Sequence, residues 1–222
     1  ADLRRAAPSR AEATVDARWA EALQLHETSK IYRVLAMELL HRSSRAGGGL
    51  PVPPLDVDAA YRCFFDEAAD HRDEQVELLL GIVMSAYEPL SSAHLDELGL
   101  LPACKRLPGV GLLFQERDHL LQQLHLSLRE FLTDEQRSGR HAVDEHAGHL
   151  ALACSSIRIL QERDAGPTLT YALKYGHVHL TQVVSRVFAA GADGDCPPEV
   201  CEWLDALLEP RPPDLSAEQN AS

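Results

Sequence analysis

The apolar residues of this chain recur mainly every three or four positions, which is the spacing of a helix with one buried face. The clearest run follows Asp73, a residue type suited to capping a helix, and stops at Pro89, which cannot continue one. The apolar positions of this run are Val76, Leu79, Leu80, Val83, Met84 and Tyr87. We therefore predict an amphipathic helix here that buries this face.

The same spacing predicts helices nearer the N-terminus. After a tail or frayed helix over residues 1–15, it predicts one long helix over 16–46, or two helices joined near Thr28. A short helix from about Asp56 follows a proline-rich linker at 50–54. The predicted buried faces hold Trp19, Leu23, Ile31, Val34, Leu35 and Leu39 in the first region and Tyr61, Phe64, Phe65 and Ala68 in the second.

Helical spacing returns in the C-terminal part of the chain. It predicts helices over about 144–161, 171–187 and 198–208. The final residues, 210–222, are polar and rich in proline, so we predict a disordered tail there. The overall pattern thus predicts a mainly α fold.

The stretch from 90 to 114 contains shorter elements. Ser91 or Ser92 can cap one short helix, and a second is expected at 103–107. The apolar run at 110–114 then predicts a strand. Two helices joined by a short turn and followed by strand signals are typical of a helix-turn-helix with a wing.

Composition restricts the class of protein. The chain has 222 residues, of which 45% are hydrophobic and 25% charged, which is enough to build one or two folded cores. A formal net charge of -13 disfavours a general binder of nucleic-acid phosphates. There is no signal peptide and no run of eighteen apolar residues, so we expect no membrane association.

The cysteines favour a reducing compartment. The chain has 5 cysteines, scattered and odd in number, which fits reduced thiols in a cytoplasmic protein better than a disulfide framework. The one close pair, Cys196 and Cys201, fits no standard zinc-ligand spacing. We therefore predict no metal site from the cysteines.

Several short motifs, in order over about residues 17–185, resemble the winged-helix and following helical region of NACHT-type STAND signalling NTPases. The central motif is His-x-Ser-x-x-x-Phe-Leu-Thr-Asp, which begins at His125 and ends at Asp134. The others are Tyr61 with Phe64 and Phe65, Leu79–Val83, Tyr87–Ser91, Gly148 with His149 and Leu152, and Tyr171–Tyr175 with His179.

The resemblance implies a mainly α fold, with a winged helix that carries a small β-hairpin wing and is followed by a helical domain. The corresponding organisation is an N-terminal helical segment and linker at 1–49 and a winged-helix domain with its leading helix at 50–138. A helical domain at 139–209 and the disordered tail at 210–222 follow.

Local signals conflict between His119 and Leu132. Periodicity alone favours a single helix, whereas the resemblance makes residues 119–125 the second strand of the wing, paired with 110–114 across a turn at 116–118. Ser127 is a competent N-cap with Glu130 three residues later, which forms a capping box. We therefore predict a strand followed by a helix that begins at Ser127.

The resemblance also implies a function, that of a non-catalytic regulatory module of a signal-transduction ATPase. In that family the winged helix holds the ADP-bound, autoinhibited state, and the residue here in the matching position is His125, which would contact an ADP phosphate. ADP or ATP would belong to the full-length protein. The implied partners are an upstream nucleotide-binding domain, other copies on activation, and proteins bound through downstream ankyrin or WD repeats.

The chain itself lacks the motif that binds ATP phosphates. No Gly-x-x-x-x-Gly-Lys-[Ser/Thr] loop occurs, and the glycines at 47–49 are not followed by the required Lys and hydroxyl residue. We therefore expect no ATP hydrolysis, no catalytic residue and no cofactor in this chain alone. Because residue 1 is Ala rather than Met, we expect a piece of a longer protein.

Two other functions stay open. The first is a helical scaffold for protein–protein interaction. The second is a winged-helix DNA-binding domain, for which Lys105, Arg106 and Arg117 are the local cations.

The sequence also contains a weak metal-binding pattern and a weak repeat pattern. His141, His146 and His149 with nearby Asp144 and Glu145 suggest a metal, but the order is not His-Glu-x-x-His, so a solvated helix face is preferred. The stretch 168–177, with the Gly-Ala-Asp at 191–193, faintly resembles one ankyrin repeat.

Overall fold

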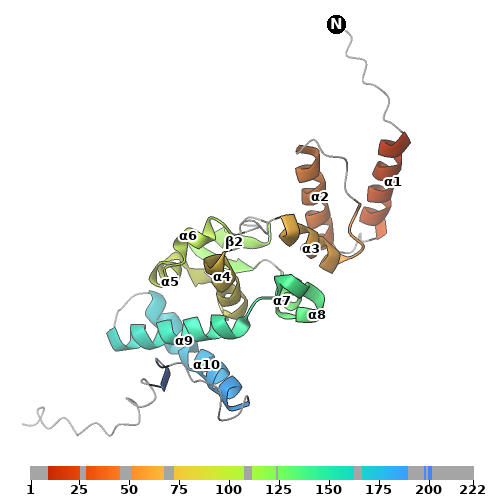
Figure 1. Cartoon of the computed structure of the whole chain (residues 1–222). Coiled ribbons are helices and arrows are strands. Elements are labelled where there is room, and N and C mark those ends of the chain that lie inside the picture. The colour runs from red at the N-terminus through yellow and green to blue at the C-terminus, as the bar shows by residue number, and fades with distance from the viewer. Residues whose placement is uncertain are drawn as a thin grey trace, which may run out of the picture. The chain divides into compact units, whose positions relative to one another are not determined.

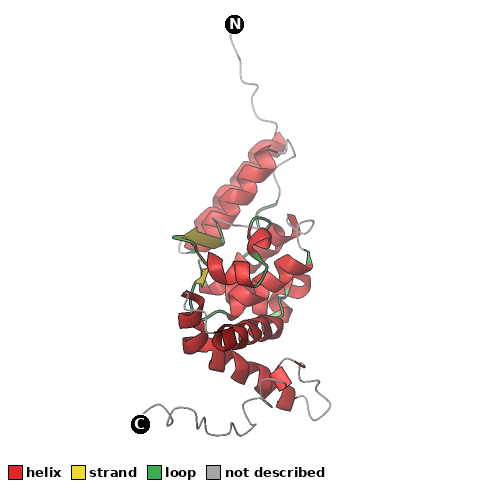
Figure 2. Ribbon diagram, turned by 90° about the vertical axis from the view of Figure 1, so that its left-hand side faces the viewer, coloured by secondary structure: helices red, strands yellow, loops and turns green. Residues whose placement is uncertain are grey.

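The computed structural model describes residues 10–25, 29–45, 52–67, 73–107, 112–123, 125–162 and 167–189, with Pro198, Val200 and Cys201. These residues are mainly helical with one small antiparallel sheet, as predicted (Figure 2). The chain forms two compact units, Ala1–Gly148 and His149–Ser222, whose boundary falls inside helix α9. The sequence placed a domain boundary earlier, after residue 138.

Figure 1 labels most of these elements along the chain. In order they are α1 (Arg10–Leu25), α2 (Lys30–Arg45), α3 (Val57–Glu67), α4 (Glu74–Ser85), β1 (Leu90–Ser91), α5 (Ser92–Glu97), α6 (Leu101–Cys104), β2 (Phe114–Arg117), β3 (Leu120–Gln123), α7 (Leu126–Thr133), α8 (Glu135–Ser138), the 3-10 turn η2 (Gly139–His141), α9 (Glu145–Glu162) and α10 (Pro167–Ala189).

The N-terminal region contains two helices rather than one, and α1 begins at Arg10, earlier than the predicted Asp16. Trp19 is buried as predicted, but Val34 is 45% exposed. The buried face of α2 instead starts from Tyr32, whose hydroxyl donates to the carbonyl of Pro54 at 2.6 Å. Val34 lies outside the buried face of this helix, which is formed by Tyr32, Leu35, Ala36 and Leu39.

Helix α4 is the centre of the first unit and contacts β3, α6 and α7. Its N-cap is Asp73, as predicted, and the carboxylate accepts from the backbone N–H of Val76 at 3.0 Å. Every residue from Leu79 to Ser85 is buried, so the helix is covered on all sides. The prediction for Tyr87 is wrong: α4 ends at Ser85, and Tyr87 lies beyond it with 41% of its surface exposed.

The sheet has the strand order β1-β3-β2 among the described residues, and both pairings are antiparallel. Leu121 is buried while its neighbour Leu120 is 39% exposed, which is the alternation of a strand, so the strand predicted at 119–125 is confirmed over residues 120–123. Its partner is β2, so the partner strand predicted at 110–114 is placed too early. The predicted turn at 116–118 is wrong. The turn is Asp118-His119, with positive φ at both positions, which is the geometry that suits a two-residue hairpin.

Two short helices lie between β1 and β2 in the chain. Ser91 caps α5, as predicted, and Gly99 after it has φ +69°. Helix α6 ends at Cys104, so the predicted helix over 103–107 is placed too late. Pro102 in its first turn is compatible with a helix start at Leu101.

An aromatic cluster joins α3 to α7. The ring of Phe131 lies 5.1 Å from that of Tyr61 and 6.4 Å from that of Phe65, and all three side chains are fully buried. Beside them, Arg137 of α8 donates two hydrogen bonds to Asp58 at 2.8 and 2.7 Å. These hydrogen bonds hold the pKa of the Asp58 carboxyl below its usual range. The position of α3 against α7 and α8 is thereby fixed by both apolar and ionic contacts.

The second unit contains the longer part of α9 and all of α10, and both helices agree with the sequence apart from the earlier start of α10 at Pro167. Gly176 allows the two helices to approach closely, because a Cβ there would lie 2.9 Å from the Cβ of Ser156. Of the predicted last helix, Pro198, Val200 and Cys201 are helical. The predicted tail at 210–222 lies outside the described residues. Each helix in the described ranges is too short or too polar to cross a bilayer.

The first turn of α9 crosses α4 at a pair of glycines. A Cβ on Gly148 would overlap the carbonyl of Gly81 and lie 2.6 Å from Oγ of Ser85. A Cβ on Gly81 would lie 2.8 Å from the carbonyl oxygen of Asp144. The Ser85 hydroxyl donates to the carbonyl of Glu145 at 2.9 Å, which adds a polar contact to the crossing.

We expect Gly148→Ala to lower the free energy of unfolding by about 2 kcal/mol, because the obstructing atoms belong to the backbone of Gly81 and cannot rotate away. At an open helical site the same change would raise stability by about 0.5–1 kcal/mol. Urea unfolding of both forms measures the difference. The double variant Ser85→Ala/Gly148→Ala should stay destabilised, and a stabilised Gly148→Ala protein would contradict the close crossing.

Candidate functional site

His125, the candidate residue from the sequence, lies between β3 and α7 with extended backbone, φ -145° and ψ 134°. It is the N-cap of α7: its Nδ1 accepts from the backbone N–H of Ser127 at 3.1 Å. The prediction that Ser127 caps this helix is therefore wrong. The helix begins at Leu126, and the imidazole satisfies an N–H group that has no partner within the first turn.

Ser127 connects His125 to the protein interior. Its Oγ lies 2.6 Å from Nδ1 of His125 and 2.9 Å from the hydroxyl of Tyr61. Tyr61 belongs to α3 and is fully buried, and this burial raises the pKa of its phenol, so the phenol keeps its proton at neutral pH. The three residues form a chain of hydrogen bonds from a buried hydroxyl to an exposed imidazole.

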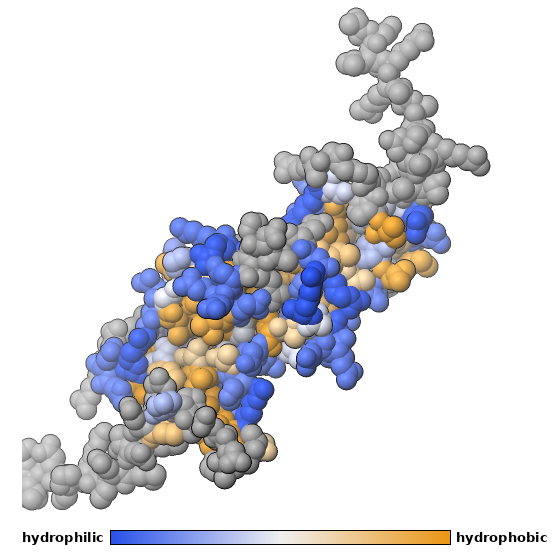
Figure 3. Space-filling view, viewed as in Figure 1, coloured by the Kyte–Doolittle hydropathy of each residue, from blue (hydrophilic) through white to orange (hydrophobic). Residues whose placement is uncertain are grey.

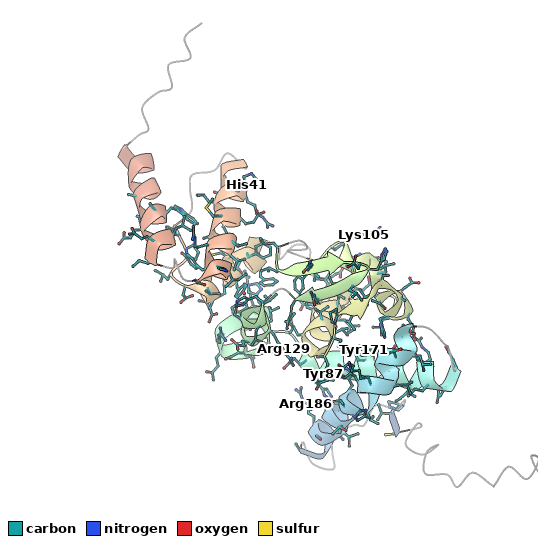
Figure 4. The ribbon with its side chains drawn as sticks, turned by 180° about the vertical axis from the view of Figure 1, so that it is seen from behind. His41, Tyr87, Lys105, Arg129, Tyr171 and Arg186 are labelled. Atoms are coloured by element: carbon teal, nitrogen blue, oxygen red, sulfur yellow. The ribbon has the colours of Figure 1, made fainter. Side chains whose placement is uncertain are left out.

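The surface beside His125 combines apolar and charged side chains. Leu126, the first residue of α7, is 63% exposed. Arg129, labelled in Figure 4, contacts the carboxylate of Glu145 at 3.1 Å. Apolar residues are interspersed among polar ones over the face of the molecule in Figure 3.

A second network lies in the other unit and was not predicted. Nδ1 of His179 lies 2.8 Å from Nδ1 of His149, and Nε2 of His179 lies 2.9 Å from the hydroxyl of Tyr171. His179 has no exposed surface. Burial, and to a lesser extent the neighbouring His149, lowers the pKa of His179 to about 3. The sequence contained one signal: Tyr171 and His179 are eight residues apart, so they lie on the same side of a helix.

The histidines at 141, 146 and 149, which suggested a metal in the sequence, have other neighbours or lie apart in the described structure. His141 is buried and its Nε2 lies 2.6 Å from Oδ1 of Asp66, so the solvated-face interpretation is wrong for this residue. His149 points to His179, and Glu145 pairs with Arg129. In the described part of the chain, no three His, Cys, Asp or Glu side chains are grouped so as to hold a metal ion.

Comparisons with protein-family models, with curated proteins and with solved structures found no match to this chain. The function must therefore be argued from the arrangement of its own residues.

The low pKa of His179 predicts a pH-dependent stability. The unfolded chain protonates this residue near pH 6.5, whereas the folded chain resists protonation until about pH 3. The stability that His179 contributes is therefore complete above about pH 6.5. It is lost as the pH falls toward 3, by about 1.4 kcal/mol per pH unit.

The measurement is urea unfolding of the wild type and of His179→Gln between pH 7 and pH 4. The difference in free energy of unfolding between them should shrink as the pH falls, because Gln does not titrate. His177→Gln, an exposed position on the same helix, is the matched control and should leave the pH dependence of the wild type unchanged. A constant difference between wild type and His179→Gln would contradict the low pKa.

Proposed function

We propose that this chain is a non-catalytic regulatory module of a STAND signalling ATPase of the NACHT type. In this proposal α4 to β3 form a winged helix, and His125 contacts a phosphate of ADP bound to a nucleotide-binding domain upstream in the full-length protein. The contact holds the autoinhibited state until ATP replaces ADP. The observation that carries the proposal is an imidazole at the exposed start of α7, immediately after the hairpin.

The order of elements supports the winged-helix part of the proposal. A helix, a short strand, two further helices and a hairpin follow one another as α4, β1, α5, α6, β2 and β3, and β3 lies between β1 and β2. In this arrangement β1 is an edge strand of the sheet, and the turn Asp118-His119 joins β2 to β3. The same order is expected for a helix-turn-helix with a wing.

The chemistry of His125 supports the phosphate contact. An imidazole that accepts through Nδ1 carries its proton on Nε2 when neutral, and an N–H donor is suited to a phosphate oxygen. His125 and Leu126 are both exposed, so a second domain can reach the donor and cover the apolar side chain together. A domain that leaves this surface on ATP exchange would release the module.

The DNA-binding alternative has less support. Helix α6, which would occupy the position of the recognition helix, has only 4 residues. Arg106 beside it is engaged in an ion pair with Asp73 at 2.9 Å. Lys105, labelled in Figure 4, is exposed, but a chain of net charge -13 provides little overall attraction for phosphates.

The scaffold alternative is supported by one specific feature. A cavity of about 140 Å³ opens between α9 and α10, and its lining includes Leu160, Leu173 and Leu180. A helical partner could occupy such an apolar groove. This function predicts that His125 is dispensable, which separates it from the leading proposal.

The test requires the full-length protein. Sequencing the complete transcript should reveal a P-loop motif upstream of residue 1. With that protein purified in its ADP-bound form, His125→Ala should accelerate ADP release by about tenfold, the equivalent of one charge-assisted hydrogen bond. His119→Asn, another exposed histidine that lies in the left-handed region where Asn is tolerated, should release ADP at the wild-type rate. Equal rates for His125→Ala and wild type would overturn the proposal.

A further inference from the structure

We infer that Tyr61 and Ser127 are positioning residues for His125: they hold its imidazole in the tautomer that carries the proton on Nε2, so that a donor faces outward only while α3 is packed against α7. The outward donor is the group that the proposed function needs, so this inference rests on that function for its purpose. The tautomer of His125 and its dependence on the packing of α3 can be tested without any nucleotide.

One donor in this network has a fixed role. The backbone N–H of Ser127 always donates, and it points at Nδ1 of His125 over 3.1 Å. This contact favours the form of the imidazole in which Nδ1 offers its lone pair. In a neutral imidazole the proton then lies on Nε2, the nitrogen that is directed away from Ser127.

The positions of the hydroxyl hydrogens of Ser127 and Tyr61 follow from the acceptor role of Nδ1. Because Nδ1 is an acceptor, the hydroxyl of Ser127, 2.6 Å away, must be the donor of that second hydrogen bond. Its hydrogen is then directed to His125, so the Ser127 oxygen can only accept from Tyr61 at 2.9 Å. The hydrogen bonds thus run in one direction, from Tyr61 through Ser127 to His125.

Tyr61 is suited to be the first donor in this series of hydrogen bonds. It is fully buried, and burial raises the pKa of its phenol, so the group remains a donor across the neutral range. Its ring packs on Phe131 of α7 at 5.1 Å, which fixes where the hydroxyl lies. The Ser127 oxygen therefore meets a donor whose proton and position are both set by the core.

The chain of hydrogen bonds couples the tautomer to helix packing. Tyr61 is on α3, whereas Ser127 and His125 belong to α7 and its cap. The ion pair of Asp58 with Arg137 and the hydrogen bond between Asp66 and His141 hold α3 in place. If α3 moves away, Ser127 loses its donor and its hydroxyl is free to rotate. Only the backbone N–H then favours the Nε2–H form, and the proton can redistribute over both nitrogens of His125.

The experiment is NMR on this 222-residue chain labelled with ¹⁵N-histidine, in which the ring ¹⁵N shifts of each tautomer differ. Comparison with His125→Gln identifies the His125 signals. We expect the wild type to show predominantly the Nε2–H pattern at pH 8. Ser127→Ala and Tyr61→Phe should both shift His125 toward a mixture of tautomers, and Ser127→Thr, which keeps a hydroxyl, should restore the wild-type pattern.

The controls separate this effect from a loss of folding. Tyr32→Phe also removes a buried hydroxyl, but one that donates to Pro54, so it should leave the His125 pattern unchanged. The signals of His149 and His179 in the other unit should stay constant in all variants, which reports intact packing there. A predominant Nδ1–H pattern in the wild type, or no change in both Ser127→Ala and Tyr61→Phe, would overturn the inference.

A second measurement distinguishes this inference from the proposed function. In the full-length protein, Tyr61→Phe should accelerate ADP release by about fivefold, which corresponds to one ordinary hydrogen bond. If the tautomer shifts as expected but neither Tyr61→Phe nor His125→Ala affects ADP release, the positioning role stands and the ADP function is wrong. If the tautomer does not shift, the positioning role is wrong whatever the rate of ADP release.

Discussion

The packing of α3 against α7 is the contact on which the candidate site depends. Tyr61 contributes its ring to the aromatic cluster with Phe131 and its hydroxyl to Ser127, so one side chain serves both the core and the surface site. The ion pair between Asp58 and Arg137 restrains the same helix beside this cluster. A buried phenol hydroxyl needs a hydrogen-bond partner, and Ser127 meets this need at the start of the helix that His125 caps.

Much of the fold could be predicted from the sequence because apolar residues spaced three and four positions apart indicate helices. Helix α4 was predicted with its cap, Asp73, since that residue type and the apolar spacing agree. The hairpin was harder, because Leu120 and Leu121 also fit a helical face. Only the burial of one and the exposure of the other distinguish the strand, and burial depends on residues distant in sequence. Element ends were least predictable, as α6 and the hairpin turn illustrate.

The site was predicted in part. His125 was selected through a resemblance, and Ser127 was predicted as the cap of this helix, but the cap is His125. Ser is the commoner N-cap, and statistics of residue types cannot reveal that an imidazole two positions earlier accepts from the backbone N–H of Ser127. The contribution of Tyr61 was inaccessible because it is 66 residues away from Ser127 along the chain. Its aromatic neighbours indicated a packing surface, not a hydrogen bond to a helix cap.

The two histidine networks differ in a way that bears on function. In the hydrogen bonds from Tyr61 through Ser127 to His125, the peptide N–H of Ser127 can only donate, so it favours one direction for the whole series. Between Tyr171, His179 and His149, each hydrogen bond joins two groups that can either donate or accept, so these contacts alone allow both directions. His179 is also buried and resists protonation, which suits a structural role in stabilising α9 against α10. A defined outward donor requires both a fixed direction and an exposed end, and His125 combines the two.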